Sequence, residues 1–504
     1  MKVKTIAIVG GGTAGWMSAA TLSKLFPDKT IYVIESPNIA PIGVGESTIK
    51  AFNHWLEMLD IEDTDFMKAT DATYKLNITL KDFYAKDTEA FSYPFTFPYE
   101  TGLPRGKNLW FLKKQTRPGL SLSDYARWLS PITLFSEQGK VPSYNDRRIP
   151  GFNFKYDIAY HFNAHKFGVW LRDKFIKPNK VKHILEEITS IETDENGIKT
   201  LNKKYTADLF LDCSGFNSIL MNKIKSEKNR SASKILINNR AWVAQVPHKN
   251  KEVRSTTTLC TAIQNGWVWE IPTWKRMGVG YVHSTKFTDP DSALAELQYH
   301  LKDNGYQYKG IDYKYIKFDT YRYERMFDKN VCAIGLSACF VEPLESTGLL
   351  FIHDNLLALG RCLQRHDHIT QLDRDTFNTY GNKVYDGYVD FLAYHFYATS
   401  RTDTEYWRYF YNTSLLDLSY NKDEGIRANM LARLEENWFN PGFGFHYIAA
   451  GMNYDPLDLI SRDVIGDTIM DAIKARDEWV DSVRDFVKKE ETHYNFLKKH
   501  IYHD

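Results

Sequence analysis

The chain has 504 residues, of which 25% are charged and 43% are hydrophobic. Lysine and arginine number 64 against 63 aspartate and glutamate, so the net charge is close to zero and argues against a nucleic-acid partner. A globular composition at this length predicts two or three structural units around a large core. Aromatic residues reach 14%, which suits a protein that handles flat rings, although an AT-rich coding sequence gives the same bias.

The cysteines and the N-terminus indicate the compartment. Five cysteines stand at positions 213, 260, 332, 339 and 362, an odd number without CxxC or metal-finger spacing. They predict reducing surroundings and no metal site. The N-terminal apolar run enters glycines without a small-residue cleavage site, and no run of 18 apolar residues occurs in the sequence. We therefore expect a cytoplasmic protein without a membrane partner.

The predicted elements begin with a strand, a glycine turn, a helix and a strand. Residues 4–9 form a short apolar run, "WMSAATLSKLF" has helical spacing, and "TIYVIES" predicts a second buried strand. Next, "YKLNITLKDFY" alternates like a strand, and "YHFNAHKFGVWLRDKF" predicts a helix. The segment "KHILEEITSIETDENGIKTLNKKYTADLFLDCSG" predicts strands joined by a turn at "DENG". Residues 225–320 carry further strands, and the chain after Gly348 is mostly helical.

The first turn, "IAIVGGGTAGW", has the G-x-G-x-x-G spacing of a dinucleotide site between strand and helix. The first glycine allows the tight turn, the second lets a pyrophosphate approach the backbone, and the third lets the helix pack on the strand. An acid at the end of the second strand would accept ribose hydroxyls. The predicted contacts here are Gly10, Gly12, Thr13, Ala14, Gly15 and Glu35.

Two later segments favour FAD over NAD. Both "ADLFLDCSG" and "VCAIGLSACF" predict a buried strand ending in small residues, Gly335 among them, as expected where distant segments close around one extended flavin nucleotide. The alternative is that both are ordinary core strands.

The predicted fold class is α/β. A glutathione-reductase-type FAD-binding Rossmann module is interwoven with a mixed β-sheet substrate region and followed by a C-terminal mostly helical part. No Pro/Gly/Ser-rich linker separates these parts. We place the FAD module at 1–360, with inserted segments at about 51–160 and 225–320. We expect 361–504 to form a helical substrate-binding part packed on that module.

Seven stretches together resemble the flavin-dependent halogenases of the tryptophan-halogenase type. They span roughly 5–410 in the expected order, and they are "GGGTAGW", "IGVGEST", "YHFNAH", "DLFLDCSG", "GWVWEIP", "FVEPLESTG" and "TSRTDTEYW". The resemblance implies an enzyme that uses FADH2, supplied by a separate flavin reductase, together with O2 and halide. The halide becomes hypohalous acid, and an active-site lysine presents the halogen to an electron-rich aromatic ring.

In "GWVWEIP" the strand period of two puts Trp267, Trp269 and Ile271 on one face, and Pro272 ends the strand. The resemblance implies that this wall lies beside the flavin and keeps the organic substrate away from it, whereas filling of a core is the alternative. Gly45 in "IGVGEST" is also predicted to contact the cofactor.

In "FVEPLESTG" the resemblance implies a halide site at Thr347 and Gly348 and catalytic roles for Glu345 and Ser346. Gly348 is expected to take backbone angles closed to other residues, so that consecutive amides point at one anion. A turn before a helix, capped by Ser346 or Thr347, is the plainer reading and is compatible with an anion site.

Lys75 matches the active-site lysine of the family. Alternation alone would put it with Asn77, Thr79 and Lys81 on a solvated strand face, so its catalytic role comes from the resemblance. A hydrogen bond to hypohalous acid and a lysine haloamine both stay open. Glu345 matches the family's acidic partner, which would hold the lysine protonated, polarise the hypohalous acid or take the ring proton.

The substrate region departs from the tryptophan-specific members, because "NPGFGFHYIAAGM" lacks their Tyr-Tyr pair. We expect Phe95, Phe445, His446 and Tyr447 to bind a free aromatic substrate of indole or phenol type, not strictly tryptophan. Loop packing is the alternative role for these rings.

Two other functions stay open at this point. The fold alone would also serve a flavin monooxygenase that hydroxylates an aromatic substrate, or a flavin-binding protein without catalysis. The native substrate, the preferred halide and the oligomeric state, a homodimer included, are not specified by the sequence.

Overall fold

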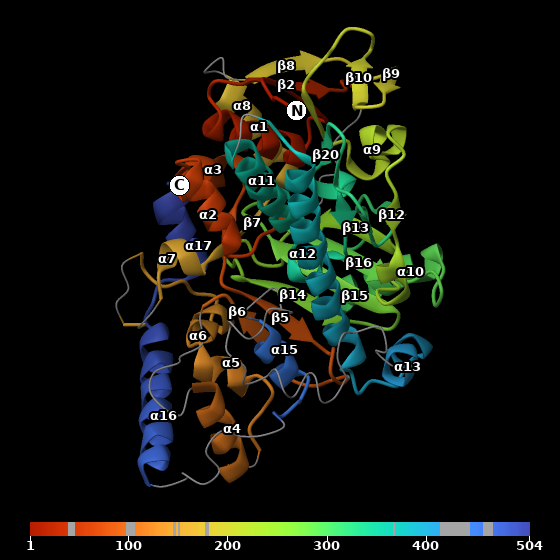
Figure 1. Cartoon of the computed structure of the whole chain (residues 1–504). Helices are drawn as coiled ribbons and strands as arrows, with labels where there is room; N and C mark the ends of the chain where they lie inside the picture. The colour runs from red at the N-terminus through yellow and green to blue at the C-terminus, as the bar shows by residue number, and fades with distance from the viewer. Residues whose placement is uncertain are drawn as a thin grey trace. The chain divides into compact units, whose positions relative to one another are not determined.

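The computed structural model describes residues 1–38, 46–96, 106–117, 119–144, 148–149, 152–176, 181–365, 368–413, 444–456 and 467–503 (Figure 1). The chain forms two compact units. Unit 1 comprises Met1–Ala72, Phe162–Ile237 and Lys317–Val389, and unit 2 comprises Thr73–His161, Asn238–Ile316 and Asp390–Asp504. In the described residues, no helix combines the length and apolarity needed to cross a bilayer.

Unit 1 is built on a six-stranded sheet that confirms the predicted Rossmann module. Its order is β19 (Phe327–Asp328), β20 (Val331–Ala333), β11 (Leu209–Asp212), β1 (Thr5–Val9), β2 (Thr30–Glu35) and β8 (Val181–Leu185). All neighbours pair in parallel except β19 with β20. The two distant strands predicted to join the nucleotide module, β11 and β20, therefore lie on one side of β1. Ile6, Ala7 and Ile8 are fully buried, as in parallel sheets covered on both faces.

The remaining elements of unit 1 are helices and small strands. The helices are α1 (Thr13–Leu25), α2 (Ala51–Met58), α3 (Asp63–Thr70), α8 (Ala164–Ile176), α9 (Ile219–Lys223), α11 (Gly348–Arg365) and α12 (Gln371–Tyr397), which runs on past the unit at Val389. The small strands are β3 (Glu46–Ser47), β9 (Ile191–Asp194), β10 (Gly197–Leu201), β12 (Lys228–Asn229), β18 (Tyr321–Tyr323) and β21 (Cys339–Phe340). The hairpin β9–β10 turns at the predicted "DENG".

The helix predicted from "YHFNAHKFGVWLRDKF" starts later than expected. Residues Ala159–Phe162 form strand β7, and α8 begins at Ala164. Asn163 explains the boundary, because its side-chain oxygen accepts a hydrogen bond from the Lys166 amide at 3.1 Å and so caps the helix.

Unit 2 is built on a seven-stranded sheet. Its order is β17 (Lys314–Lys317), β13 (Arg240–Val246), β16 (Met277–His283), β15 (Gly266–Pro272), β14 (Thr257–Ala262), β5 (Asn77–Lys81) and β6 (Phe91–Pro94). Val268, Val279 and Tyr281 pack with Leu297 of α10 (Pro290–Asp303) in one core cluster. The strand predicted over "YKLNITLKDFY" is broken at Leu76: β5 joins this sheet, whereas β4 (Thr73–Lys75) pairs with β7.

The other helices of unit 2 are short except for α16. They are α4 (Gly106–Thr116), α5 (Asp124–Leu129), α6 (Ile132–Glu137), α7 (Phe154–Asp157), α13 (Glu405–Asn412), α15 (Phe445–Gly451), α16 (Asp467–Val487) and α17 (His493–Leu497). The described chain after Gly348 is mostly helical, as predicted. Helix α11 and most of α12 belong to unit 1, and the segments 73–161 and 238–316 belong to unit 2. The functional division at residue 360 stays a prediction.

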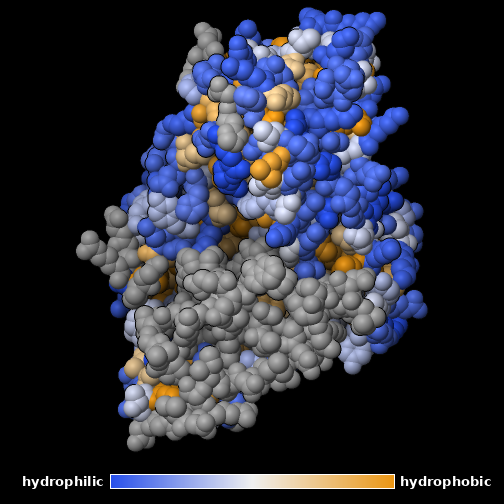
Figure 2. Space-filling model, in the orientation of Figure 1, coloured by the Kyte–Doolittle hydropathy of each residue, from blue (hydrophilic) through white to orange (hydrophobic). Residues whose placement is uncertain are grey.

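Hydrophilic residues cover most of the described surface on the face shown in Figure 2, and apolar residues are scattered. The large exposed apolar side chains, such as Leu185 in unit 1 and Tyr299 in unit 2, come from separate elements. Isolated apolar side chains are normal on a soluble surface and mark no site.

Candidate active site

The glycine turn of unit 1 has the geometry that a dinucleotide requires. Gly10 has a φ of +118°, and a Cβ there would lie 2.2 Å from the Cys213 carbonyl oxygen. A Cβ on Gly15 would lie 1.9 Å from the Gly10 carbonyl oxygen, so only glycine lets α1 approach β1. At Gly12, the first residue before α1, no described atom lies within 4 Å of a Cβ position. The turn therefore leaves open space beside the helix N-terminus, where phosphate binds.

The other predicted cofactor contacts of unit 1 surround this turn. The Thr13 hydroxyl donates to the Ala164 carbonyl at 3.1 Å, and Gly335, with a φ of +69°, would bring a Cβ to 3.0 Å from that of Ala14. The Glu35 side chain lies over Gly11 and is 2.7 Å from His183 Nε2, a partner that sequence reasoning missed. These residues fit a flavin dinucleotide. Gly45 lies outside the described residues.

The segment "FVEPLESTG" forms a tight turn that opens α11. A short helical turn over Pro343–Glu345 precedes Ser346, whose φ is +56°, and the Phe351 amide donates to the Thr347 carbonyl at 3.0 Å. The expected backbone role of Gly348 is therefore wrong: the left-handed residue is Ser346, and Gly348 is already the first helical residue. At Gly348 no described atom lies within 4 Å of a Cβ position, so the absent side chain leaves room at a helix N-terminus.

Glu345 is 2% exposed in this turn, which makes it a buried acid. The charge of Glu345 affects the Tyr388 phenol of α12. Burial first, and then this charge, raise the pKa of Tyr388 well above its usual value. The surroundings of Glu345 in unit 1 are thus poorly hydrated, a condition that strengthens the electrostatic effect of a carboxylate on nearby groups.

Lys75 is fully buried, at 0% exposure, although alternation alone would have placed it in water. It ends β4 and pairs with Ala159 of β7. Its ammonium nitrogen lies 5.0 Å from the centroid of the Phe95 ring. Along the predicted polar face, Asn77 is buried with Lys75, Thr79 is partly buried, and Lys81 at the far end is exposed.

Trp267 and Trp269 project from one face of β15, as predicted, with ring centroids 5.8 Å apart. All seven residues of this strand are buried. Gly280 on the neighbouring strand makes room for the wall, because a Cβ there would lie 2.0 Å from the Trp269 ring.

Three of the four predicted substrate residues gather in one aromatic cluster of unit 2, which we define as Tyr93, Phe95, Tyr125, Phe391, His446 and Tyr447. Its ring centroids lie 4.3–6.3 Å from their neighbours, with Tyr93 bridging Phe95 and Tyr447. The fourth, Phe445, precedes His446 on α15 and packs edge to face on Tyr394 at 4.7 Å. The Tyr125 hydroxyl is 2.8 Å from His446 Nδ1. Because Phe95 also contacts Lys75, the ammonium and the aromatic cluster are continuous.

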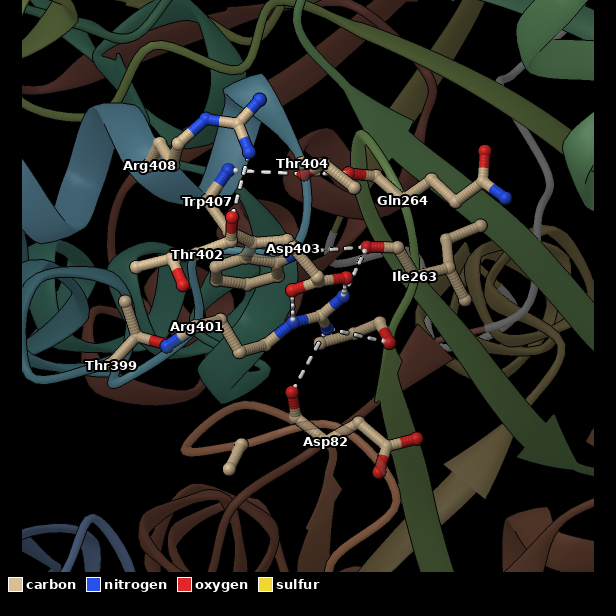
Figure 3. Close-up of polar contacts among 12 residues, drawn as sticks. Asp82, Ile263, Gln264, Thr399, Arg401, Thr402, Asp403, Thr404, Trp407 and Arg408 are labelled. Atoms are coloured by element: carbon tan, nitrogen blue, oxygen red, sulfur yellow. Dashed lines mark hydrogen bonds and ion pairs between the residues drawn. The ribbon is translucent and has the colours of Figure 1, made fainter.

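The segment 399–407 matched the family without an assigned role, and Figure 3 shows what it holds. Arg401 is buried and donates to the carbonyls of Asp82, Ala262 and Ile263 at 3.0, 3.2 and 3.4 Å. Its guanidinium forms a two-pronged ion pair with Asp403, both contacts at 2.9 Å. The Ala262 carbonyl ends β14 and the Ile263 carbonyl begins the turn to β15, so Arg401 fixes the hairpin that carries the tryptophans.

Two further contacts from the same segment reach that turn (Figure 3). The Trp407 indole donates to the Ile263 carbonyl at 2.7 Å, and the Thr404 hydroxyl donates to the Gln264 carbonyl at 2.8 Å. Sequence reasoning assigned no residue here to the site, because these side chains bind distant backbone.

Unit 2 thus brings together Lys75, the aromatic cluster and the tryptophan strand. Unit 1 holds the glycine turn, Gly335 and the turn before α11. The dinucleotide and halide contacts predicted from the sequence therefore belong to unit 1, and the predicted lysine and substrate residues belong to unit 2.

Comparisons with known proteins match most of the chain. A family model described as tryptophan halogenase matches residues 5–459. Tryptophan 6-halogenase ThaL of Streptomyces albogriseolus is 32% identical over 461 residues, covering 86% of this chain and 83% of that protein. Tryptophan 7-halogenase RebH of Lentzea aerocolonigenes is 31% identical, covering 85% and 83%.

Solved structures agree with the sequence comparison. The apo structure of VirX1 has a TM-score of 0.89 and 34% identity over 99% of this chain and 100% of that chain. Xcc4156, a flavin-dependent halogenase from Xanthomonas campestris, has a TM-score of 0.85 and 26% identity over 99% and 98%. The chain therefore belongs to the tryptophan halogenase family, and it is a flavin-dependent enzyme that uses FADH2, O2 and halide to halogenate aromatic substrates.

Proposed function

We propose that this enzyme halogenates a free, electron-rich aromatic compound of indole or phenol type, with Lys75 presenting the halogen to the ring. The observation that carries the proposal is the complete burial of Lys75, whose ammonium lies 5.0 Å from the Phe95 centroid at the edge of the aromatic cluster. Lysine is among the residues least often fully buried, because its charge loses hydration. A role in passing an electrophile to an aromatic ring would explain why a lysine lies at this position beside Phe95.

The cofactor would be held by the glycine turn, with Gly10, Gly12, Thr13, Ala14, Gly15, Glu35 and Gly335 as its contacts. Bound FADH2, with O2 and halide, supplies the two-electron oxidation that converts halide into hypohalous acid. The amides of Thr347 and Gly348 at the start of α11 would bind the halide, since a helix N-terminus stabilises anions. The resemblance gives Trp267 and Trp269 their role beside the flavin and Gly45 its contact with it.

Lys75 acts on the hypohalous acid in one of two forms. A protonated lysine donates a hydrogen bond to the hypohalous oxygen, and a neutral one forms a haloamine. In both, the ring contributes an electron pair to the new carbon–halogen bond and then loses a proton. With hydrogen-bonded hypohalous acid the oxygen leaves as water in this step, whereas in the haloamine route water leaves when the haloamine forms and the ring displaces the lysine amine. Glu345 is the proposed acceptor of that proton, a general-base role open to a buried carboxylate. Ser346 lies next to it in the same turn and is proposed as a catalytic neighbour.

The substrate class follows from the aromatic cluster. Phe95, Phe445, His446 and Tyr447 offer ring faces and edges for stacking, which bind indoles and phenols without an amino acid part. The Tyr125–His446 pair adds a polar group within the cluster. A separate flavin reductase is the proposed source of FADH2.

The test is product mass. Purified enzyme is incubated with FAD, a flavin reductase, NADH and chloride, bromide or iodide over a panel of indoles and phenols. We expect products heavier by one halogen and lighter by one hydrogen, formed only with halide and reduced flavin. Products that gain one oxygen would instead identify a monooxygenase, and no turnover across the panel would contradict the proposed indole or phenol substrate class.

A further inference from the structure

The backbone around Lys75 is fixed by hydrogen bonds from distant parts of unit 2. The amide of Tyr74 donates to His493 Nε2 at 3.1 Å, and the amide of Leu76 donates to the Thr256 carbonyl at 2.7 Å. The Thr73 hydroxyl donates to the carbonyl of Pro272, which ends the tryptophan strand, at 2.5 Å. The backbone amides of both neighbours of Lys75 are therefore hydrogen-bonded, and the Tyr74 amide is bonded to a histidine side chain.

The His493 ring must be neutral to make this contact. A backbone amide is a donor, so Nε2 has to be the acceptor, and the proton is then on Nδ1, which lies 3.1 Å from the Arg254 carbonyl. Full burial lowers the pKa of His493 to about 3, so the ring stays neutral in the folded protein near neutral pH. One imidazole thus joins the Tyr74 amide to the Arg254 carbonyl.

The segment that carries His493 packs on the rest of unit 2 through other contacts as well. Tyr502 stacks on Trp274 with ring centroids 4.0 Å apart and planes at 7°, and Tyr494 stacks on the same indole at 5.1 Å. Phe496 contacts the Tyr74 ring edge to face at 6.0 Å. A change confined to the His493 ring therefore leaves most of the docking surface in place.

A second buried histidine, His161, supports β4 from β7. Its Nδ1 lies 3.3 Å from the Thr73 hydroxyl, and its Nε2 lies 2.9 Å from the Thr258 hydroxyl. Burial first, and then the charge of nearby Lys75, lower the pKa of this ring well below its usual value. Both histidines beside β4 are thus neutral, and neither adds a positive charge next to the ammonium.

We propose that His493 is a positioning residue for Lys75: by holding the Tyr74 amide it sets the direction in which the lysine side chain leaves β4. This inference rests on the proposed function of Lys75 and names a residue beyond the stretch 5–459 that matches the family model. Small displacements of a reacting group are costly, since a shift of about 1 Å can cost about 100-fold in rate.

The experiment compares His493→Phe, which keeps the ring volume and loses the acceptor, with His493→Gln, whose side-chain oxygen can reach the Tyr74 amide. The measured quantity is halogenated product per FADH2 oxidised, together with free hypohalous acid caught by a halogen-accepting trap in solution. Binding of FAD and thermal unfolding are recorded for each variant.

We expect His493→Phe to lower the product fraction by about 10-fold to 100-fold and to raise the trapped oxidant, with FADH2 oxidation little changed. The Gln variant should recover most of the product. A matched control is His283→Phe, because His283 is equally buried in unit 2 and neither of its ring nitrogens has a hydrogen-bond partner among the described residues. This control should keep the wild-type product fraction.

A wild-type product fraction in His493→Phe, or a Gln variant no better than Phe, would overturn the positioning role. Should the Phe variant not fold, His493→Asn serves, because its shorter side chain stays polar but cannot reach the Tyr74 amide; it must then show the same loss. A wild-type enzyme that forms no halogenated product would instead refute the proposed function itself.

Discussion

The glycine turn of unit 1 and the lysine strand of unit 2 reach their geometry in opposite ways. Gly15 packs against Gly10 five residues away, and the Cys213 carbonyl is the main distant neighbour of the turn. Lys75 contacts the ring of residue 95, and its neighbours in the chain are bonded to groups from residues 256, 272 and 493. A site built from local backbone can therefore be predicted from a short sequence motif. The burial of a side chain by distant segments cannot be predicted in this way.

The largest expected effect comes from substituting Lys75 itself. Lys75→Met keeps the length of the side chain and removes the donor, so we expect a loss of about 100-fold to 10,000-fold in the rate of product formation. Binding of FAD should stay at the wild-type level, because the glycine turn belongs to unit 1. Product formation is measured by mass with bromide and an indole.

Lys81→Met is the matched control for that substitution. Lys81 lies at the exposed end of β5, where the same change removes a solvated charge. Product formation by this variant should remain within a few-fold of wild type. Equal losses in the two variants would contradict a specific role for Lys75.

Two glycine substitutions separate folding from cofactor binding on the other side of the comparison. Gly15→Ala places a Cβ 1.9 Å from the Gly10 carbonyl oxygen, so we expect it to lower the free energy of unfolding by about 3 kcal/mol or more. Gly12→Ala meets no described atom within 4 Å, so its stability without FAD should stay unchanged while its FAD affinity falls. Urea unfolding and flavin titration test both. An unchanged FAD affinity in Gly12→Ala would contradict a pyrophosphate at this turn.

Arg401 sharpens the comparison, because it fixes the tryptophan hairpin only through long-range contacts. Arg401→Met removes the donor to the carbonyls of Asp82 and Ala262, whereas the Ile263 carbonyl keeps the Trp407 indole, and we expect a loss of about 2–3 kcal/mol in the free energy of unfolding. The exposed Arg408, which makes one contact to the Thr402 carbonyl, gives the control Arg408→Met, with a change below about 0.5 kcal/mol. Comparable losses in the two variants would contradict the anchoring role of Arg401.

Acid should destabilise unit 2 before unit 1. Among the described residues, unit 2 holds four histidines with a lowered pKa (His161, His248, His283 and His493), and unit 1 holds one (His353). Burial is the main cause in each. These rings stay neutral when folded but bind protons below a pKa of about 6.5 when unfolded, so stability is complete above that pH and falls as the pH decreases.

At pH 5 each such histidine costs about 2 kcal/mol. Peptide-resolved hydrogen exchange between pH 7 and 5, corrected for intrinsic rates, should show segments 73–161 and 238–316 opening first. His493→Gln should reduce the loss of stability between pH 7 and 5 by the contribution of one histidine. Earlier opening of unit 1 would contradict the assignment.

The fold was predictable where the pattern is local. The strand–turn–helix–strand start, the "DENG" hairpin and strand β15 all follow the predicted order. The break of the predicted strand at Leu76 was not predictable, because it depends on the pairing of β4 with β7 and of β5 with β14. The start of α8 could have been found from Asn163, a good helix cap that the predicted helix ran through.

The site was predictable to a lesser extent. The resemblance placed Lys75, Phe95 and Tyr447 in one region, and the structure joins them through aromatic contacts. It carried no signal for His493, which lies 419 residues from Tyr74. The backbone role expected of Gly348 belongs to Ser346, because the left-handed residue precedes the helix by two positions.

The most direct test of the central claim is the partition of oxidant between product and solution in wild type and Lys75→Met. Both enzymes receive FADH2, O2, bromide, an indole and a trap for hypobromous acid. Wild type should put bromine on the indole, and the variant should oxidise FADH2 at a similar rate while its bromine appears in the trap. A Lys75→Met enzyme that brominates the indole with the wild-type yield would contradict the account.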